Sequence, residues 1–316
     1  MTDLTSLMQR VLQRVVGRHR EVELLVAALA ADRHVLLEGP PGTGKSTLLR
    51  AVADELGLGF EFVEGNAELT PARLVGHFDP ARVLHEGYVP DVFVDGPLVT
   101  AMRDGSLLYV EEINRIPEET LNVLITVMSE RELHVPRLGR VVALSGFRLV
   151  AAMNPFDAIG TARISSAVYD RVCRLAVGYQ DAADEVSIVR RENVGAESLA
   201  ERWLDGVVEV VRRTRAHGDV RIGSSVRGAI DTVAVARSLA GLRGVTPVER
   251  LLGRDAALVA LSGSLRLREG CSRTAEDIVG ELWDEVFPAE APESGAGGGD
   301  ASPGKATTPV GATSQH

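Results

Sequence analysis

The stretch that decides the fold reads Val35-Leu36-Leu37-Glu38-Gly39-Pro40-Pro41-Gly42-Thr43-Gly44-Lys45-Ser46-Thr47. The apolar run Val35 to Leu37 is typical of a strand that is buried on both faces of a parallel sheet. A glycine-rich turn follows it, and Ser46 to Leu56 has the pattern of a helix. Glycines let consecutive backbone N–H groups curl around an anion, and the start of a helix adds further unpaired N–H groups. The stretch therefore predicts a phosphate-binding loop between a strand and a helix.

Within this loop, two side chains have separate expected tasks. Lys45 is expected to reach the β- and γ-phosphates of a nucleotide, and the hydroxyl of Ser46 is expected to hold Mg²⁺. A simple Gly/Pro turn is the alternative, but the strand before the loop and the helix after it favour phosphate binding. The nucleotide-binding residues predicted from the loop are Gly39, Pro40, Pro41, Gly42, Thr43, Gly44, Lys45, Ser46 and Thr47.

Outward from the loop, strand and helix patterns alternate over the first 180 residues. Apolar runs predict strands at 35–37, 60–63, 107–110, 147–153 and 174–177, and helical spacing predicts helices at 18–31, 46–56 and from Pro117 onward. Such alternation is typical of an α/β fold with a five-stranded parallel sheet and flanking helices. The sequence therefore predicts an α/β nucleotide-binding domain over residues 1–180.

The remainder of the chain has a different character. Segments near 184–194, 198–215, 225–240, 247–262 and 274–286 have helical patterns, which predicts a small all-helical domain over residues 181–288. Residues 289–316 contain six Gly and three Pro but no Leu, Ile, Met or aromatic residue, so they are expected to form a disordered tail.

Composition limits the classes of function. The chain has 44 acidic and 34 basic residues and a net charge of −10, which argues against a general nucleic-acid binder, although a local basic channel stays open. The two cysteines have no metal-site or redox spacing, which favours a reducing cytoplasm. No apolar run approaches the ~18 residues of a membrane span, and the N-terminus lacks the pattern of a signal peptide. A cytoplasmic protein without a membrane span is expected.

Polar residues follow two further strands. Glu111 and Glu112 end the strand at 107–110, at the sheet edge where ligands of parallel sheets bind. The first acid is expected to lie behind Mg²⁺, and the second to polarise a water that attacks the γ-phosphate. Asn154 ends another strand, where its amide could bond the water or a γ-phosphate oxygen. Closing a turn before Pro155 is an equally good reading of Asn154.

With these residues in place, the chain resembles a MoxR-type AAA+ ATPase, in the wider group that includes the magnesium-chelatase ATPase subunit. The resemblance runs from about Val16 to about Arg243, and implies a P-loop AAA+ fold with a helical lid. It covers the following segments: Val15-Val16-Gly17-Arg18 on the adenine side, Gly39 to Ser46 as Walker A, Leu107 to Arg115 as Walker B and its tail, Asn154 as sensor 1, Asp170-Arg171 at the arginine finger, and Ser225-Val226-Arg227 at sensor 2.

The resemblance also implies roles for two arginines. Arg171 would neutralise phosphoryl charge in the site of a neighbouring subunit, and Arg227 would act on the nucleotide of its own chain. Three positions depart from the family pattern: Glu111 stands where Asp is usual, Val172 where Phe is usual, and Arg163 where a neutral residue is expected. Arg163 is therefore a second candidate for contact across a subunit boundary.

Two segments resemble the insertions of this clade. The segment from Gly76 to Pro80 onward resembles an insertion in helix 2, and Arg131 to Arg148 resembles a β-hairpin before sensor 1. Both are expected to project from the sheet. The basic cluster Arg212-Arg213-Thr214-Arg215 is expected to be a solvated helix face. No metal site is assigned beyond Mg²⁺.

Three functions follow as hypotheses. The first is an oligomeric ATP-driven remodeller of a protein partner, since the resemblance implies a homo-oligomeric, hexameric ring and often a partner with a von Willebrand A domain. The second is a nucleic-acid-dependent NTPase, which the net acidity disfavours. The third is a small-molecule kinase, which would need a lid and an acceptor site, not sensor residues and a trans arginine.

Overall fold

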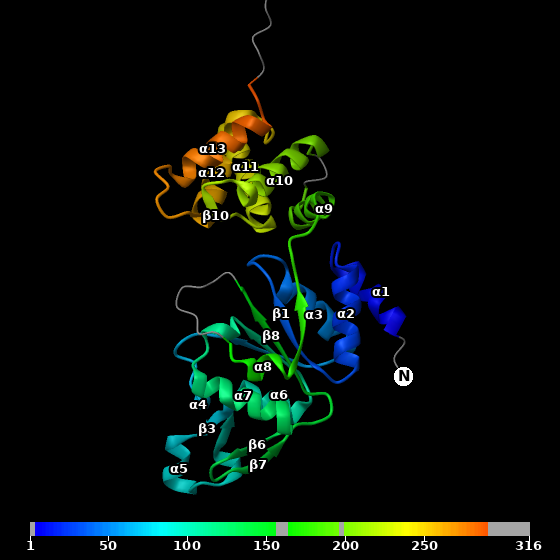
Figure 1. Ribbon diagram of the computed structural model, residues 1–316, viewed down its shortest axis with the longest axis vertical. Helices are drawn as coiled ribbons and strands as arrows, with labels where there is room; N and C mark the ends of the chain where they lie inside the picture. Colours follow the sequence, from blue (N-terminus) through cyan, green and yellow to red (C-terminus); the bar gives the residue numbers. More distant parts are fainter. Residues whose placement is uncertain (1–3, 156–163, 196–198, 290–316) are drawn as a thin grey trace, which may run out of the picture.

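The computed structural model describes residues 4–155, 164–195 and 199–289. Figure 1 shows an α/β lobe joined to a mainly helical lobe through the segment between β9 and α9. The central sheet contains β1 (His34–Glu38), β2 (Phe60–Glu64), β5 (Leu107–Glu111), β8 (Arg148–Met153) and β9 (Val172–Ala176). Its helices are α1 (Leu4–Arg14), α2 (His19–Ala30), α3 (Lys45–Leu56), α6 (Pro97–Asp104), α7 (Glu118–Glu130) and α8 (Ser166–Tyr169).

The sheet has the strand order β2-β5-β8-β1-β9, and every neighbouring pair is parallel. The predicted five-stranded parallel sheet is confirmed, and no strand end differs from its predicted position by more than two residues. Because β8 lies between β5 and β1, the carboxyl ends of the three strands that carry the predicted site residues are adjacent. This is the sheet edge at which open α/β folds bind ligands.

The two faces of the sheet have separate cores. Leu36, Leu108 and Leu149 pack with α6 and α7 on one face. Alternate residues of the same strands, among them Val35 and Leu37, pack with α1, α2 and α3 on the other. Burial on both faces explains why these strands are continuous apolar runs instead of alternating patterns. Helix α1, whose Leu7 is fully buried, was not predicted from the sequence.

Both predicted insertions are present, and they lie side by side at the end of the α/β lobe that is distant from the helical lobe (Figure 1). The first contains an antiparallel pair, β3 and β4, and the second is the antiparallel hairpin β6–β7. The guanidinium of Arg137, in the hairpin turn, lies 3.7 Å from the centre of the Tyr88 ring in the first insertion. The elements are α4 (Pro71–Val75), β3 (Gly76–Phe78), α5 (Pro80–Glu86), β4 (Phe93–Asp95), β6 (Glu132–Val135) and β7 (Gly139–Val142), with the 3₁₀ turn Pro90–Val92 in the first insertion.

The second lobe is mainly helical, as expected, and has a core of its own around Trp283. It also contains a short antiparallel pair, β10 and β11, so the expectation of an all-helical region is wrong in this detail. Segments of two and three residues are too short for a periodic sequence signal. The elements are α9 (Ala182–Glu192), α10 (Glu201–Ala216), β10 (Val220–Ile222), α11 (Val226–Arg243), α12 (Arg250–Leu261), β11 (Arg266–Leu267) and α13 (Ala275–Val286). Arg163 and residues 290–316 of the predicted tail lie outside the described residues.

Within residues 4–155, 164–195 and 199–289, no helix is both long enough and apolar enough to cross a bilayer.

A buried histidine begins β1. The Nδ1 atom of His34 accepts a hydrogen bond from the backbone N–H of Leu149 at 2.9 Å. Burial, with a smaller contribution from the charge of Arg131, lowers the pKa of His34 from 6.5 to about 4. In the folded protein the imidazole of His34 therefore stays neutral down to about pH 4, whereas in the unfolded chain it takes up a proton near pH 6.5. Stability from this group is complete above pH 6.5 and is lost as the pH falls toward 4.

His34→Asn tests this effect, because Asn can accept the same hydrogen bond but does not titrate. Between about pH 7 and about pH 4.5, the wild type should lose roughly 2–3 kcal/mol more unfolding free energy than His34→Asn. Urea unfolding at the two pH values measures the difference. Parallel pH dependence in both proteins would show that His34 does not titrate as described.

Candidate functional site: a nucleotide pocket between two lobes

The glycine-rich loop connects β1 to α3 and lies against the segment that leads to the helical lobe. A Cβ atom at Gly39 would lie only 1.9 Å from the carbonyl oxygen of Val177, so no other residue fits there. Lys45 is buried, and its Nζ donates to the carbonyl oxygens of Gly39 at 2.9 Å and Pro40 at 2.8 Å. Burial lowers the pKa of Lys45, and the charge of Glu111 opposes the shift.

Two side-chain oxygens of the kind that bind metal ions lie close together at the end of β5. The hydroxyl of Ser46 lies 3.2 Å from Oε1 of Glu111 and 3.1 Å from the hydroxyl of Tyr109. Hydroxyl and carboxylate oxygens are the donors that Mg²⁺ accepts, and the ion keeps several of its own waters and phosphate ligands. Ser46 and Glu111 therefore fit the predicted magnesium site, directly or through water. Bound there, the ion would neutralise phosphate charge.

The pocket at this sheet edge brings most of the predicted residues together. Its lining includes Glu112, Asn154 and Arg227 together with Lys45 and the ends of β5 and β8. Glu112 has a left-handed backbone (φ 51°), unusual for a residue with a side chain, and its carboxylate pairs with Arg115 at 2.9 Å. Two carboxylates, an amide and two cations thus surround the space in front of the loop. That combination suits the chemistry of a phosphoryl group and an attacking water.

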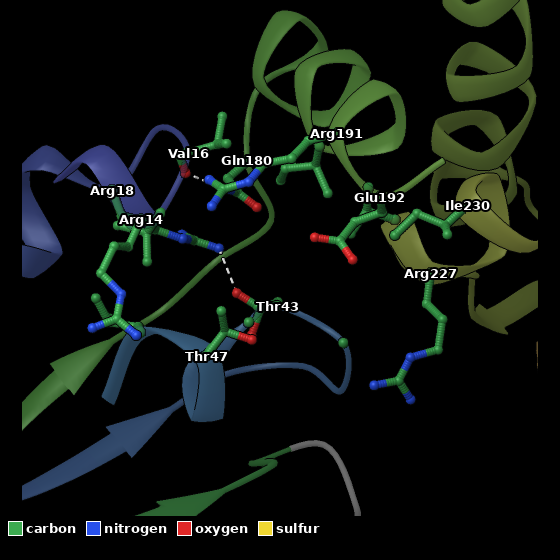
Figure 2. A pocket seen from close by; sticks show the side chains of 16 residues that line it. Arg14, Val16, Arg18, Thr43, Thr47, Gln180, Arg191, Glu192, Arg227 and Ile230 are labelled. Carbon is green, nitrogen blue, oxygen red and sulfur yellow. Dashed lines mark hydrogen bonds between the residues drawn. The ribbon is translucent and has the colours of Figure 1, made fainter. Parts of the chain in front are cut away.

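A second pocket, of about 350 Å³, extends from the loop toward the helical lobe. Figure 2 shows Val16 and Arg18 on one side, and Glu192 and Arg227 projecting from the helical lobe on the other. Of the two predicted adenine-side residues, Val16 lines this pocket, and Gly17 is not among the described lining residues. Gly39 and Pro40, which were also predicted to bind the nucleotide, accept the hydrogen bonds of Lys45 through their carbonyl oxygens.

The structural role of Arg18 was not predicted from the sequence. It is 5% exposed, and its Nη2 donates to the carbonyl oxygens of Thr43 at 2.7 Å and Gly178 at 2.8 Å. One guanidinium therefore holds the phosphate loop to the segment between the lobes. Gln180, Arg191 and Glu192 also line the pocket without having been predicted. They lie in the connecting segment and α9, far along the chain from any motif, and no local pattern marks them.

Arg171 lies apart from these residues. It is not among the described residues that line either pocket. Its Nη1 donates to the carbonyl oxygen of Ala167 at 2.8 Å, and its Nε donates to the hydroxyl of Ser129. The next residue, Val172, pairs with His34 at the start of β1, whereas the loop follows the end of that strand. At ~3.3 Å per residue, about 13 Å of strand separates the two positions.

The basic cluster on α10 is not the solvated face that was expected. Arg212 and Arg215 both pair with Glu185, a carboxylate of α9 that is 1% exposed. Only Arg213 follows the expectation, since it forms surface pairs with Glu209 and Glu285. The sequence could not reveal this, because Glu185 lies about 30 residues away on another helix.

The contact between Gly42 and Ser225 generates a test of the closeness of the two lobes. Gly42 has φ +70°, and a Cβ there would lie 2.2 Å from the hydroxyl oxygen of Ser225 at the start of α11. Gly42→Ala should weaken nucleotide binding through about 1–2 kcal/mol of backbone strain and through the added overlap. In Gly42→Ala/Ser225→Gly the overlap is removed and the strain remains.

Isothermal calorimetry should show that the double variant recovers part of the lost affinity. Ser225 makes no side-chain capping bond to the described part of α11, so Ser225→Gly alone serves as the control and should bind almost normally. If the double variant binds no better than Gly42→Ala, the contact does not limit binding.

Comparisons with known proteins agree with this geometry. Residues 34–172 match the family model described as the AAA domain of the dynein-related subfamily. An uncharacterized protein of Staphylococcus epidermidis is 29% identical over 231 residues, which is 72% of this chain and 84% of that protein. An uncharacterized protein of Staphylococcus aureus is 29% identical over 226 residues, 71% of this chain and 82% of that protein.

Two solved structures share the architecture. A presumed ATPase from Cytophaga hutchinsonii has a TM-score of 0.51 at 20% identity and covers 88% of this chain and 92% of its own. RuvB of Thermotoga maritima, a Holliday junction branch migration motor, has a TM-score of 0.54 at 18% identity. The match covers 80% of this chain and 72% of that chain. At such identities the likeness shows the fold alone. The family match and the shared architecture together show that residues 34–172 form an AAA domain within a chain of the AAA+ fold, which supports ATP hydrolysis.

Proposed function

We propose that this protein is a MoxR-like AAA+ ATPase that works as a homo-oligomeric, hexameric ring and uses ATP to remodel, mature or activate a protein partner. The position of Arg171, away from the pocket of its own chain, carries the proposal. A monomeric kinase would complete its active site within one chain and would not need an arginine at this position for catalysis. In a ring, it can complete the site of the next subunit.

In this proposal, each pocket residue acts on ATP or on the attacking water. The loop from Gly39 to Thr47 binds the phosphates, Lys45 neutralises them, and Ser46 and Glu111 hold Mg²⁺. Glu112 polarises the attacking water, and Asn154 orients it. Arg227 approaches the phosphates from the helical lobe, which acts as a lid. In this proposal, residues 1–180 form the nucleotide-binding domain and residues 181–288 form the lid domain.

The two insertions supply a surface for a partner. Leu84 on α5 is 83% exposed, and Tyr88 and Val94 nearby are about half exposed. Arg137 stacks on Tyr88, so the two insertions form one continuous surface. A protein with a von Willebrand A domain is the partner that the family resemblance implies. The two cysteines, Cys173 and Cys271, are free thiols, which suits a cytoplasmic location.

The first test concerns Glu112. Glu112→Gln keeps the size of the side chain and removes the carboxylate, so the variant should bind ATP and hydrolyse it at least about 100-fold more slowly. Glu111→Gln should instead weaken the dependence of the rate on Mg²⁺. Steady-state ATPase assays with magnesium titration measure both effects. Glu118→Gln, an exposed acid on α7, is the matched control. Exchanged phenotypes would reverse the two assignments.

The second test concerns Arg171. Arg171→Ala should bind ATP almost normally but lose roughly 10³–10⁵ in turnover, about 4–7 kcal/mol. Lys45→Ala should keep its Arg171 but lose its own site. Mixing the two inactive proteins under ATP should restore part of the wild-type rate, because some interfaces then pair an intact loop with an intact arginine.

Arg243→Ala, which removes an exposed arginine paired with Asp255, is the control and should keep its rate. If the mixture stays inactive although co-assembly is shown by mass, Arg171 does not act in trans. Arg163 is then the next candidate. Adding DNA to the same assay tests the alternative of a nucleic-acid-dependent NTPase, which predicts stimulation of the rate.

A further inference from the structure

A buried carboxylate lies between the lid helices behind the nucleotide pocket. Glu185 on α9 is 1% exposed, and each of its oxygens is paired with a different arginine of α10. Oε2 lies 3.0 Å from Nη1 of Arg212, and Oε1 lies 2.7 Å from Nη1 of Arg215. The two arginines are three residues apart, so they lie on one face of α10 and reach the same carboxylate.

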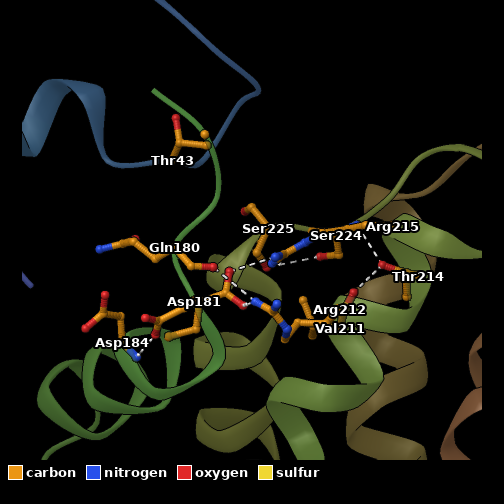
Figure 3. Close-up of polar contacts among 12 residues, drawn as sticks. Thr43, Gln180, Asp181, Asp184, Val211, Arg212, Thr214, Arg215, Ser224 and Ser225 are labelled. Atoms are coloured by element: carbon orange, nitrogen blue, oxygen red, sulfur yellow. Dashed lines mark hydrogen bonds and ion pairs between the residues drawn. The ribbon is translucent and has the colours of Figure 1, made fainter. Parts of the chain in front are cut away.

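Each arginine also holds a segment that borders the nucleotide pocket (Figure 3). Nη1 of Arg212 donates to the carbonyl oxygen of Gln180 at 3.0 Å. Nε of Arg215 donates to the carbonyl oxygen of Ser224 at 2.7 Å, and its guanidinium stacks 3.9 Å from the centre of the Tyr179 ring. Glu185 is therefore the centre of two chains of contacts.

The first chain of contacts ends at the phosphate side. Ser224 is followed by Ser225, the N-cap residue of α11, which lies against Gly42 of the phosphate loop. Arg227 is in the first turn of the same helix, and its side chain lines both pockets. The position of Ser224 thus sets where Arg227 enters the site.

The second chain of contacts ends at the adenine side. The backbone of Gln180 is held by Arg212, and its side-chain amide donates to the carbonyl oxygen of Val16. Val16 lines the pocket next to the loop. A single carboxylate in the lid is therefore connected to both ends of the space that a nucleotide occupies.

The buried charges of Glu185 and its two arginines indicate that this arrangement fixes the relative positions of the helices that carry them. A buried ion pair adds little net stability, because desolvation of the charges offsets their attraction. Its geometry is nevertheless strict, since a carboxylate without its arginines would be a buried, uncompensated charge. Here both oxygens, and the donor atoms that face them, are committed to one arrangement of α9, α10 and the start of α11.

We propose that Glu185, held between Arg212 and Arg215, is a positioning residue that sets the place of Arg227 over the nucleotide. The proposal rests on the role given to Arg227 under the proposed function. Glu185 does not touch the nucleotide, and it acts through Arg215 and Ser224.

The test is a double-mutant cycle measured by steady-state ATPase kinetics of the full chain. Glu185→Gln keeps the shape but places an amide N–H₂ against a guanidinium, so at least one of the two contacts is lost. With Arg227 present, kcat should fall by roughly tenfold to a hundredfold, the size expected for displacing a catalytic group by about 1 Å. In the Arg227→Ala background, the same change should lower kcat by less than about twofold.

A second variant keeps the test valid if Glu185→Gln does not fold. Arg215→Lys retains the charge but cannot bond Glu185 and Ser224 together as the guanidinium does. It should give the same dependence on Arg227, while KM for ATP changes by less than about threefold, because the contacts through Arg212 to Gln180 are intact. Glu209→Gln, in the exposed pair with Arg213 on the same helix, is the matched control and should leave kcat unchanged.

The outcomes separate the two proposals. If either variant lowers kcat by the same factor with and without Arg227, Glu185 supports the fold in general and the inference is wrong, while the role of Arg227 stands. If Arg227→Ala alone turns over ATP like the wild type, the role of Arg227 fails first, and the inference fails with it.

Discussion

The structure depends on the close packing of the phosphate loop against the segment that follows β9. Gly39 leaves no room for a side chain beside the carbonyl oxygen of Val177. This approach brings the end of β1 next to the chain that leads into the lid, and Arg18 holds the same two segments together. The loop is thereby fixed both to the sheet and to the hinge. A movement of the helical lobe would consequently be transmitted to the phosphate loop.

The pocket is assembled from residues of both lobes. The sheet contributes the carboxylates at the end of β5, and the lid contributes Arg227. Burial of Lys45 lowers its pKa, and Glu111 works against that shift. Charges of opposite sign thus compensate one another within the pocket. A bound nucleotide and its ion would also interact with these charges. Such interactions would favour a conformation in which the two lobes are closed around the nucleotide.

In the proposed ring, Arg171 would extend this dependence beyond the single chain. Contacts from α7 and α8 hold its guanidinium at the surface, about 13 Å of strand away from the loop of its own chain. A site that needs such an arginine is complete only when a second subunit is present. The two insertions lie at the end of the α/β lobe that is distant from the lid (Figure 1). Under the proposed function, assembly, turnover and contact with a partner would therefore use different surfaces of one protein.

The sequence by itself determined the parallel sheet, the phosphate loop, both insertions and the helical character of the lid. These features depend on contiguous runs and short spacings, which local patterns express directly. Only the tertiary structure decided that Arg18 bonds Gly178, 160 residues away, and that Glu185 is buried between two arginines. It also placed Arg227 inside the pocket and Arg171 outside it. Such contacts join distant segments whose approach follows from packing, and no local pattern of residues encodes them.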